Sequence, residues 1–576
     1  MKTKYNFSNT ILAISALSLT LAYACGKDDD DSPEAGNIIT TEVIKTNAQA
    51  QAAGNGVWGP LQTLSSSFSF LLESTSETTV SFEGAETAGG PVASRLETDP
   101  ANSYTTKIYT RLYSSIGTAN RVIEQLDSSR VTDRLNQSTK DLVKARVKFA
   151  RALSYLYLVQ LYGEVPLILS TADATDATAS KTRAAIDKVY EQIIKDLTEA
   201  EADLPDYDII RSNPSKGAAN GLLSRAYLVW GQNPLSQAEV EGIKAATADP
   251  QHSVNSERLT KAVEYADKVI SSGNYDLLQD YNRNFGVGGE NQGNEHIFTI
   301  HHDGDDIDAQ GNHQTHCPFT ERFDLLTDNH IGPADVTLVD IFDSNDKRKL
   351  YSIVTELYNA DEKTGTVSPD TKANYTKYEY KFPVTSPRFG KFIHRKSYTE
   401  ALREVAASSE DGQPNNINRI ELRYAEVLLY KAEALFFLNR ASEALPLVNQ
   451  LRSRAGVTPL TALTEDALYR EWYLELSFEQ KQWTNLVRWK TLIASVNKVK
   501  QYEYYKEDYK DNASVIAKAK SADVTLADAD VNAAFFAKIY KHLHAKTDNI
   551  SGKHYRFPIP TNGGISAGVS PQNPGY

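Results

Sequence analysis

The apolar residues of this 576-residue chain recur mostly at the spacing of an amphipathic helix. Across 104–126 they repeat every three to four residues, as Ile108, Leu112 and Ile116 do, and the same periodicity continues through the next stretch to Gly163. Gly163 with Pro166 shortly after it is typical of a helix C-terminus. Further helices are predicted at about 183–203, 216–231, 257–271, 418–438, 440–455 and 464–479, the last continuing or bending through Trp489.

Several of these helices repeat a spacing of four and then three between apolar residues, for example Tyr190, Ile194 and Leu197. The predicted helices at 418–438 and 440–455 are joined by a very short connection. Stacked antiparallel pairs of this kind are typical of tetratricopeptide-like repeats, although any amphipathic helix has the same spacing. The pattern therefore leaves a repeat superhelix and an ordinary helical domain both open.

Three long segments lack helical periodicity: 73–100, 280–335 and 355–417. The tail from Tyr555 is rich in Pro and Gly and is predicted to be extended over the surface. Long irregular segments in a compact protein often carry function. The expected architecture is mainly α, a helical scaffold with large irregular loop insertions.

Composition and charge narrow the classes of partner. Apolar residues make up 41% of the chain and charged residues 23%, which is typical of a globular protein. The net charge of −13 disfavours nucleic acid as a partner, because an acidic surface repels phosphate. The chain has two cysteines, Cys25 and Cys317, too few for a disulfide framework.

The N-terminus is predicted to be a targeting segment. Residues 1–24 combine early lysines with an apolar run that is too short to span a bilayer, which indicates a signal peptide. Cleavage after Ala24 by an ordinary signal peptidase is one reading. The other, which we favour, is a lipobox in which Cys25 is diacylated and becomes the first residue, because a lone cysteine directly follows an A-x-A-like site. Residues 25–40 are then a flexible acidic linker.

Several ordered motifs carry a family resemblance. They are "FARALSYL" with "LYGEVPL", "RYAEVLLYKAEAL", "VNQLRSRAG", "LYREWYLELSFEQKQWTNLVRWK", and the closing "PIP" and "QNPGY". Together they resemble the SusD/RagB family of outer-membrane nutrient-binding lipoproteins over essentially the whole chain. Four residues depart from the family pattern and put its usual ion pairs in doubt there: Trp472 for Arg, Gln480 for Gly, Gln482 for Arg and Asn485 for Asp.

The resemblance implies a fold and a role. The fold would be a single SusD-like domain over 41–576, with a helical-repeat part at about 41–280, a loop-rich insert at about 281–417 and a helical part with an extended tail at 418–576. Members bind oligosaccharides, or in some cases peptides, as a lid on a SusC-like TonB-dependent barrel, and are not enzymes. Only the lipid would touch the membrane, on the extracellular face. An acidic export signal of the family would lie at Lys27, Asp28, Asp29, Asp30 and Asp31.

Polar clusters suggest little further chemistry. His313, His316 and Cys317 have the side chains for a soft metal, but no fourth ligand is evident. Calcium is left open at Asp303, Asp305, Asp306 and Asp308, and otherwise no metal or cofactor is predicted. The carboxylates Glu471 and Glu475, four residues apart, are expected to form scaffold ion pairs rather than an acid–base pair.

A carbohydrate site needs aromatic faces for sugar C–H groups and polar side chains for sugar hydroxyls. The candidates are Trp58, Tyr104, Tyr281, Phe285 and Phe319, with Asn282, Arg283, Asp303 and His316 as polar neighbours. For each aromatic ring the alternative is that it anchors a loop. The functional hypotheses are a surface glycan-binding lipoprotein, the same role with peptide cargo, a structural scaffold that binds only protein, and, least favoured, a hydrolase.

Overall fold

The structure is a computed structural model that describes most of the chain from residue 44 onward. The described residues are 44–80, 87, 89–128, 135–285, 293–301 and 418–576 without 502–504, 522–525 and 562–567, with short stretches between 334 and 389. The chain from Val43 to Tyr576 forms one compact unit. The predicted signal peptide, Cys25 and the acidic linker lie outside the described residues.

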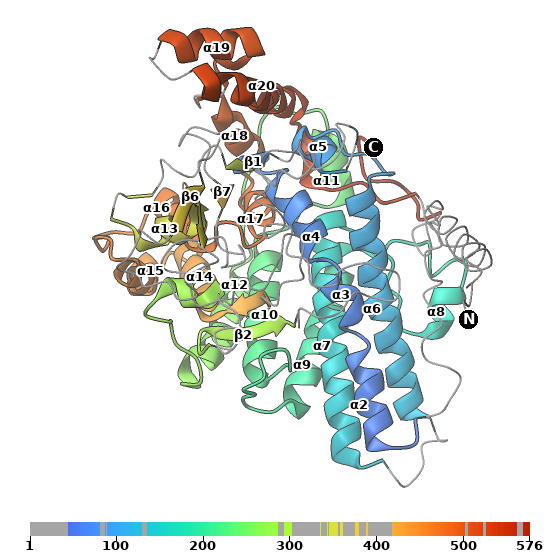
Figure 1. Cartoon of the computed structure of the whole chain (residues 1–576). Helices are drawn as coiled ribbons and strands as arrows, with labels where there is room; N and C mark the ends of the chain where they lie inside the picture. The colour runs from blue at the N-terminus through green and yellow to red at the C-terminus, as the bar shows by residue number, and fades with distance from the viewer. Residues whose placement is uncertain are drawn as a thin grey trace, which may run out of the picture. The chain divides into compact units, whose positions relative to one another are not determined.

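Helices dominate the described part of the chain (Figure 1). The longer helices are α2 (Asn47–Asn55), α6 (Ser103–Asp127), α7 (Gln137–Tyr162), α9 (Ile186–Asp203), α10 (Lys216–Gly231), α12 (Ser256–Ser271), α14 (Tyr424–Phe437), α15 (Ala441–Ala455), α16 (Glu465–Leu476), α17 (Gln482–Trp489), α19 (Asn512–Ser521) and α20 (Leu526–Asn549). The short ones are α3 (Gly59–Gln62), α4 (Ser65–Phe68), the π-helix η1 (Ser69–Glu73), α5 (Gly89–Ser94), α8 (Thr171–Thr175), α11 (Gln237–Ile243), α13 (Lys347–Ser352) and α18 (Leu492–Asn497). Short 3₁₀ turns are η2 (Tyr281–Phe285), η8 (Lys498–Gln501), η10 (Glu507–Tyr509) and η11 (Gly552–Tyr555).

The described strands are short and all pair antiparallel. One sheet has the order β1 (Thr79–Val80), β3 (Ala334–Asp335), β7 (Arg388–Phe389) and β4 (Ile353–Val354). Two further ladders pair β5 (Leu357–Ala360) with β6 (Tyr375–Tyr378), and β2 (His296–Ile300) with β8 (Arg419–Arg423).

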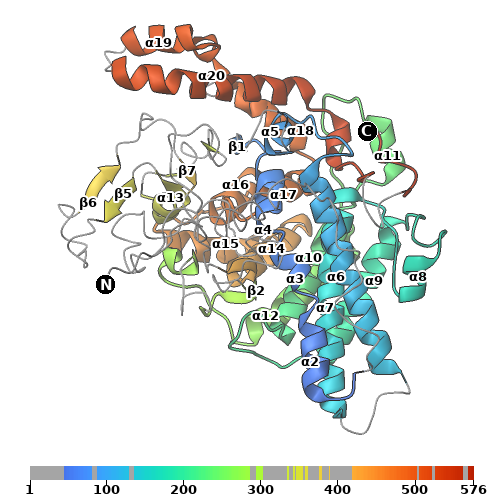
Figure 2. The ribbon, with the colours of Figure 1, turned by 45° about the vertical axis from the view of Figure 1, so that its right-hand side comes forward.

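Successive helices pack on one another along the chain. Helix α6 contacts α7, α7 contacts α9, α9 contacts α10, α10 contacts α12, α12 contacts α14, and α14 contacts α15. The two ribbon views show these helices side by side (Figures 1 and 2). This stack of neighbouring helices confirms the predicted mainly α, tetratricopeptide-like superhelix.

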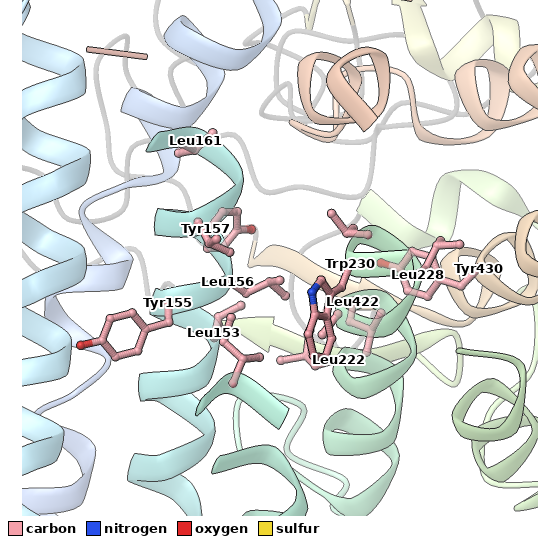
Figure 3. Packing of buried hydrophobic residues seen from close by; sticks show 14 of the residues in the cluster. Leu153, Tyr155, Leu156, Tyr157, Leu161, Leu222, Leu228, Trp230, Leu422 and Tyr430 are labelled. Carbon is pink, nitrogen blue, oxygen red and sulfur yellow. The ribbon is translucent and has the colours of Figure 1, made fainter. Parts of the chain in front are cut away.

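Helix α7 lies at the centre of the stack. Every residue from Phe149 to Tyr162 is buried, so this half of the helix is covered on all sides rather than along one stripe. Its Leu153 and Leu156 pack in a core that includes Leu222 of α10 and Leu422 of β8 (Figure 3). The "FARALSYL" motif is therefore a core-packing motif.

Two helix boundaries differ from the prediction. Helix α14 does not begin at 418: residues Arg419–Arg423 form β8, because they find a partner in β2, and Arg423 caps the helix that follows. The predicted helix at 464–479 ends at Leu476, because Phe478 and Gln480 adopt left-handed backbone angles (φ 62° and 63°). A left-handed residue ends an α-helix, so α17 is a separate element.

Only part of the C-terminal tail matches the surface path predicted for it. Phe557 and Ile559 are buried, and the backbone N–H of Phe557 donates to the carbonyl of Leu161 at the end of α7. The side-chain amide of Asn573 donates to the carbonyls of Tyr162 and Phe557. The "PIP" and "QNPGY" motifs thus fasten the tail to the end of α7.

Gly163 is required where α7 ends. Its backbone (φ 77°, ψ −123°) lies in a region open essentially to glycine, and an added Cβ would sit 2.4 Å from Nε of Arg556. We expect Gly163→Ala to lower the free energy of unfolding by about 2–3 kcal/mol, measured by urea denaturation. Gly117 lies within α6 with its nearest atom 4.0 Å from an added Cβ, so Gly117→Ala should instead stabilise by about 0.5–1 kcal/mol. Equal effects of the two substitutions on the free energy of unfolding would contradict the requirement for glycine at position 163.

Candidate functional site

A groove with a volume of about 350 Å³ opens where three distant segments meet. It is lined by Asn55, Gly56, Trp58, Gly59 and Gln62 around α3, by Ser212 and Asn213 before α10, and by Thr299, Ile300 and His301 at the end of β2. We call it the Trp58 groove. Volumes of this size are usual for small-ligand pockets.

Hydrogen bonds between the segments hold the groove together. The side-chain amide of Gln62 donates to the carbonyl of His301 at 2.9 Å, and the backbone N–H of Thr299 donates to the carbonyl of Arg211 at 3.0 Å. Helix α10 also contacts β2, and α3, α10 and β2 lie close together in both ribbon views (Figures 1 and 2). The groove is therefore built on fixed elements rather than on one loop.

Trp58 supplies the aromatic surface of the groove. Its indole ring lies 5.4 Å from the ring of Phe298 and 6.3 Å from that of Phe149, both tilted with respect to it. These contacts fix the ring, yet the side chain is only half-buried. A fixed, partly exposed indole can stack on the C–H face of a sugar, and little conformational entropy is lost because the side chain is already ordered.

Among the described residues that line the Trp58 groove, the imidazole of His301 is the one ionisable side chain. Amide groups come from Asn55, Gln62 and Asn213, and none of the lining residues that the structure describes is Asp, Glu, Lys or Arg. Thr299 is 1% exposed, and its hydroxyl has no hydrogen-bond partner. Because Thr299 is almost fully covered, its hydroxyl lies behind the surface of the groove, and the amides of Asn55, Gln62 and Asn213 are the groups that a ligand hydroxyl can meet.

An apolar ledge adjoins the groove on the loop between α9 and α10. Ile209 is 69% exposed and Ile210 49%, although both are large apolar residues. The loop is fixed by the buried Arg211, which donates to the hydroxyl of Tyr207 at 2.6 Å and whose guanidinium lies over the ring of Tyr207 and near that of Tyr275. The ledge thus adds rigid apolar surface next to Ser212.

Among the candidates from sequence that the structure describes, Trp58 alone lines the groove. Tyr104 is half-buried and packs against the core. Tyr281 and Phe285 are each 2% exposed, and the hydroxyl of Tyr281 donates to the carbonyl of Glu475. Rings with no exposed face cannot stack on a ligand, so Tyr281 and Phe285 take the anchoring role that the sequence left open.

The remaining candidates fall into two groups. Arg283 is exposed in η2 and lies outside the lining of the groove, and the structure does not describe the side chain of Asn282. Asp303, His316 and Phe319 lie outside the described residues, as do the His–Cys and Asp clusters considered for a metal. Within the described part of the chain, no group of three or more His, Cys, Asp or Glu side chains is arranged to hold a metal ion.

Glu471 and Glu475 belong to a buried ionic cluster. Both are 0% exposed and accept from Arg348, at 2.6 and 3.0 Å respectively. The other members are Glu295, Asp346, Arg423, Arg452, Arg454 and Glu479. Carboxylates held this way, away from any described cleft, form scaffold ion pairs rather than an acid–base pair.

The arginines of the cluster set the charge of Glu475. Burial by itself raises the pKa of this carboxyl, but Arg454, Arg423 and Arg348 outweigh it and hold the pKa well below its usual range. Glu475 is therefore ionised throughout the neutral range. In spite of the departures from the family pattern, Glu471 and Glu475 of this segment are thus ion-paired, with arginines from other segments.

Comparison with known proteins identifies the family. A family profile described as the SusD family matches residues 265–576, more than half of the chain. The chain belongs to the SusD family. A second profile, described as starch-binding and associating with the outer membrane, matches residues 65–228 of this SusD-family protein.

Individual relatives extend the match. The SusD-like protein P2 of Formosa agariphila is 28% identical over 508 residues, which cover 83% of this chain and 90% of that protein. Two solved structures share the fold. A SusD homologue of Bacteroides thetaiotaomicron has a TM-score of 0.65 at 21% identity, over 93% of this chain and 98% of that one. A laminarin-binding SusD-like protein has a TM-score of 0.61 at 19% identity, over 92% of this chain and 100% of that one.

Sequence reasoning missed most of the groove. Gln62, Asn213 and Thr299 are ordinary polar residues, and no motif joins the three segments that carry them. One signal was available: Ile209 and Ile210 stand in a polar loop, between the helix stop at Pro205 and the helix start at Ser215. In the described chain, no helix is long and apolar enough to cross a membrane.

Proposed function

We propose that this SusD-family protein is a lipid-anchored glycan-binding protein of the outer membrane, and that an uncharged oligosaccharide binds in the Trp58 groove. One observation carries the proposal: a fixed, half-buried indole faces a groove whose lining is amide and hydroxyl groups with no Asp, Glu, Lys or Arg among the described residues. Sugar C–H faces stack on such a ring, and sugar hydroxyls pair with amides and hydroxyls.

The comparisons support the same ligand class. The N-terminal profile is described as starch-binding, and one structural neighbour is described as laminarin-binding. Starch and laminarin are both uncharged glucans, as the lining of the groove would require. A peptide would need groups for its charged ends, and the described lining offers only the imidazole of His301.

Binding without turnover fits the described chemistry. The carboxylate pair considered for catalysis, Glu471 and Glu475, forms ion pairs within the buried ionic cluster, and both side chains are 0% exposed. The proposed role is to capture the glycan at the outer face and pass it to a SusC-like TonB-dependent barrel, over which the protein closes as a lid. This partnership rests on the family resemblance.

A ligand panel tests the proposal. Isothermal titration calorimetry of the purified protein with malto-oligosaccharides, laminari-oligosaccharides, an oligogalacturonate and a peptide digest should show binding to at least one uncharged glycan. The oligogalacturonate should bind at least about tenfold more weakly, because no cationic side chain of the described lining meets its carboxylates. Binding of peptides alone, or of no member of a broad glycan array, would overturn the glycan assignment.

The lipid anchor makes a separate prediction. Cys25→Ala should release the protein from the membrane fraction, because the acyl chains on this residue are the proposed attachment. Replacing Asp28–Asp31 with alanine should leave the protein membrane-bound but shield it from externally added protease. Membrane fractionation and protease shaving of intact cells measure both. A Cys25→Ala protein that still sediments with membranes would exclude lipid as the tether, and an alanine block that stays protease-accessible would exclude the export signal.

A further inference from the structure

A second, smaller cavity lies where four helices meet the C-terminal tail. Its volume is about 20 Å³, and its walls come from α7, α9, α10 and α17 and from residues 555–556. About 10–15 Å³ is enough for one water molecule. The cavity therefore has room for a single small occupant.

Three buried donors line this cavity without a matching acceptor. Tyr190 is 0% exposed, and its hydroxyl has no hydrogen-bond partner. Arg556 is 2% exposed: one terminal nitrogen donates to the carbonyl of Leu235, while Nε has no partner. Lys490 is 5% exposed, and its ammonium reaches only the carbonyl of Val487, at 3.5 Å. The three groups belong to α9, to the tail and to the end of α17.

The ionisable side chains in the wall of the cavity are three cations and two tyrosines, while the charges of Glu164 and Glu239 act on Arg556 from outside the wall. Lys490 and Arg556 form no ion pair with any described carboxylate, and no Asp or Glu lines the cavity. The third cation in the wall, Arg488, is already neutralised by Glu433, which accepts from its Nε at 3.0 Å and from a terminal nitrogen at 2.7 Å. A buried cation with no carboxylate directly beside it is costly, so a further counter-charge in the cavity would stabilise these two groups.

A water molecule is a poor match for this set of groups. Water accepts about two hydrogen bonds and must also place its own two protons, whereas the unsatisfied groups here are donors. A monatomic anion accepts from several donors at once and offsets the positive charge. We propose that this cavity binds a chloride-sized monovalent anion held by Lys490, Arg556 and Tyr190, and that the anion fastens the C-terminal tail to the helical stack.

The titration of Lys490 supports the site. The pKa of this ammonium is lowered to about 7, first by burial, then by the charge of Arg556 and more weakly by that of Arg488. Glu239 acts in the opposite direction, and His252 also feels the charge of Lys490. A bound anion favours protonated Lys490, so binding should be stronger below pH 7 than above it.

Thermal unfolding in different salts tests the site. Replacing sodium gluconate with sodium chloride at constant ionic strength should raise Tm by about 1–3 °C at about pH 6 and by less at about pH 8.5. Lys490→Gln should abolish the chloride response, and Tyr190→Phe should reduce it. The backbone of Lys490 is left-handed (φ 57°), and glutamine at this position has the same backbone strain, so the substitution adds none. Lys500→Gln, which removes the same charge from an exposed position, should leave the response intact.

Bromide binding provides a second test of the site if Lys490→Gln fails to fold. A crystal grown in bromide should show an anomalous peak within hydrogen-bond distance of the Tyr190 hydroxyl, and Tyr190→Phe should weaken it. Equal Tm in chloride and gluconate for the wild-type protein, or a cavity without an anomalous peak, would overturn the proposal and assign the cavity to water.

Discussion

Arg423→Met is expected to lower the free energy of unfolding by about 3–5 kcal/mol. Arg423 is 0% exposed and joins three segments of the chain. Its guanidinium donates to Glu295 at 2.7 Å, to Glu479 at 2.8 and 2.9 Å, and to the backbone carbonyl of Glu475 at 2.7 Å. Methionine fills similar volume but leaves these carboxylates buried beside fewer cations, which is why the loss is large.

Urea denaturation measures this effect, and an exposed ion pair provides the control. Arg440 and Glu443 form a bidentate pair on the surface of α15, so Arg440→Met should change stability little, because water screens such pairs. If Arg423→Met and Arg440→Met were equally stable, the cluster would not hold the C-terminal helices to β2.

Because of the same cluster, the free energy of unfolding depends on pH in the acidic range. The folded pKa of Glu475 lies below its value in the unfolded chain, so its contribution is complete above about pH 4.5 and is lost as the pH falls. Glu475→Gln should flatten this part of the stability–pH curve, which chemical denaturation at several pH values can show.

Trp58→Ala is expected to weaken glycan binding by about 10–100-fold. The substitution removes the aromatic face of the groove while its amide and hydroxyl groups stay in place. It also removes contacts with Phe149 and Phe298, so some loss of stability accompanies it, and Trp58→Phe, which keeps a ring, should retain part of the affinity. Calorimetry with the glycan found in the ligand panel measures each variant.

Asn213→Ala refines this result, because it removes one amide from the lining of the groove. Asn213 is only half-buried, so stability should change little, while affinity should drop by about two- to tenfold. Tyr265→Ala offers a matched aromatic control on α12, outside the lining of the groove. Unchanged affinity in Trp58→Ala, or an equal loss in Tyr265→Ala, would place the ligand elsewhere.

Local signals explain which parts of the fold the sequence predicts. Helix α6 begins after Asn102, whose side chain accepts from the backbone of Tyr104 and Thr105, and α7 ends at a left-handed Gly163. Caps and apolar periodicity are properties of neighbouring residues, so they can be recognised in sequence. The helix at 526–549 lacks a comparable stripe and was not predicted.

Long-range contacts explain the errors. Residues 419–423 form a strand because β2, more than a hundred residues earlier, offers an edge to pair with. The end of α16 after Leu476 cannot be recognised in the sequence, because Gln480 occupies a left-handed position where the family usually has glycine.

Long-range contacts also explain why the candidate site could be predicted only in part. Tyr281 and Phe285 have the residue types expected of a sugar site, but whether such a ring is covered depends on Glu475 and Arg454, far along the chain. Trp58 was found by residue type alone. Its partners Ser212 and Thr299 become neighbours only when α10 and β2 pack together.

The most direct test of the glycan proposal is a crystal structure of this protein with a bound uncharged oligosaccharide. We predict a sugar ring stacked on the indole of Trp58, with one of its hydroxyls within hydrogen-bond distance of the side-chain amide of Gln62 or Asn213. An oligosaccharide bound on another face, with the Trp58 groove empty, would contradict it.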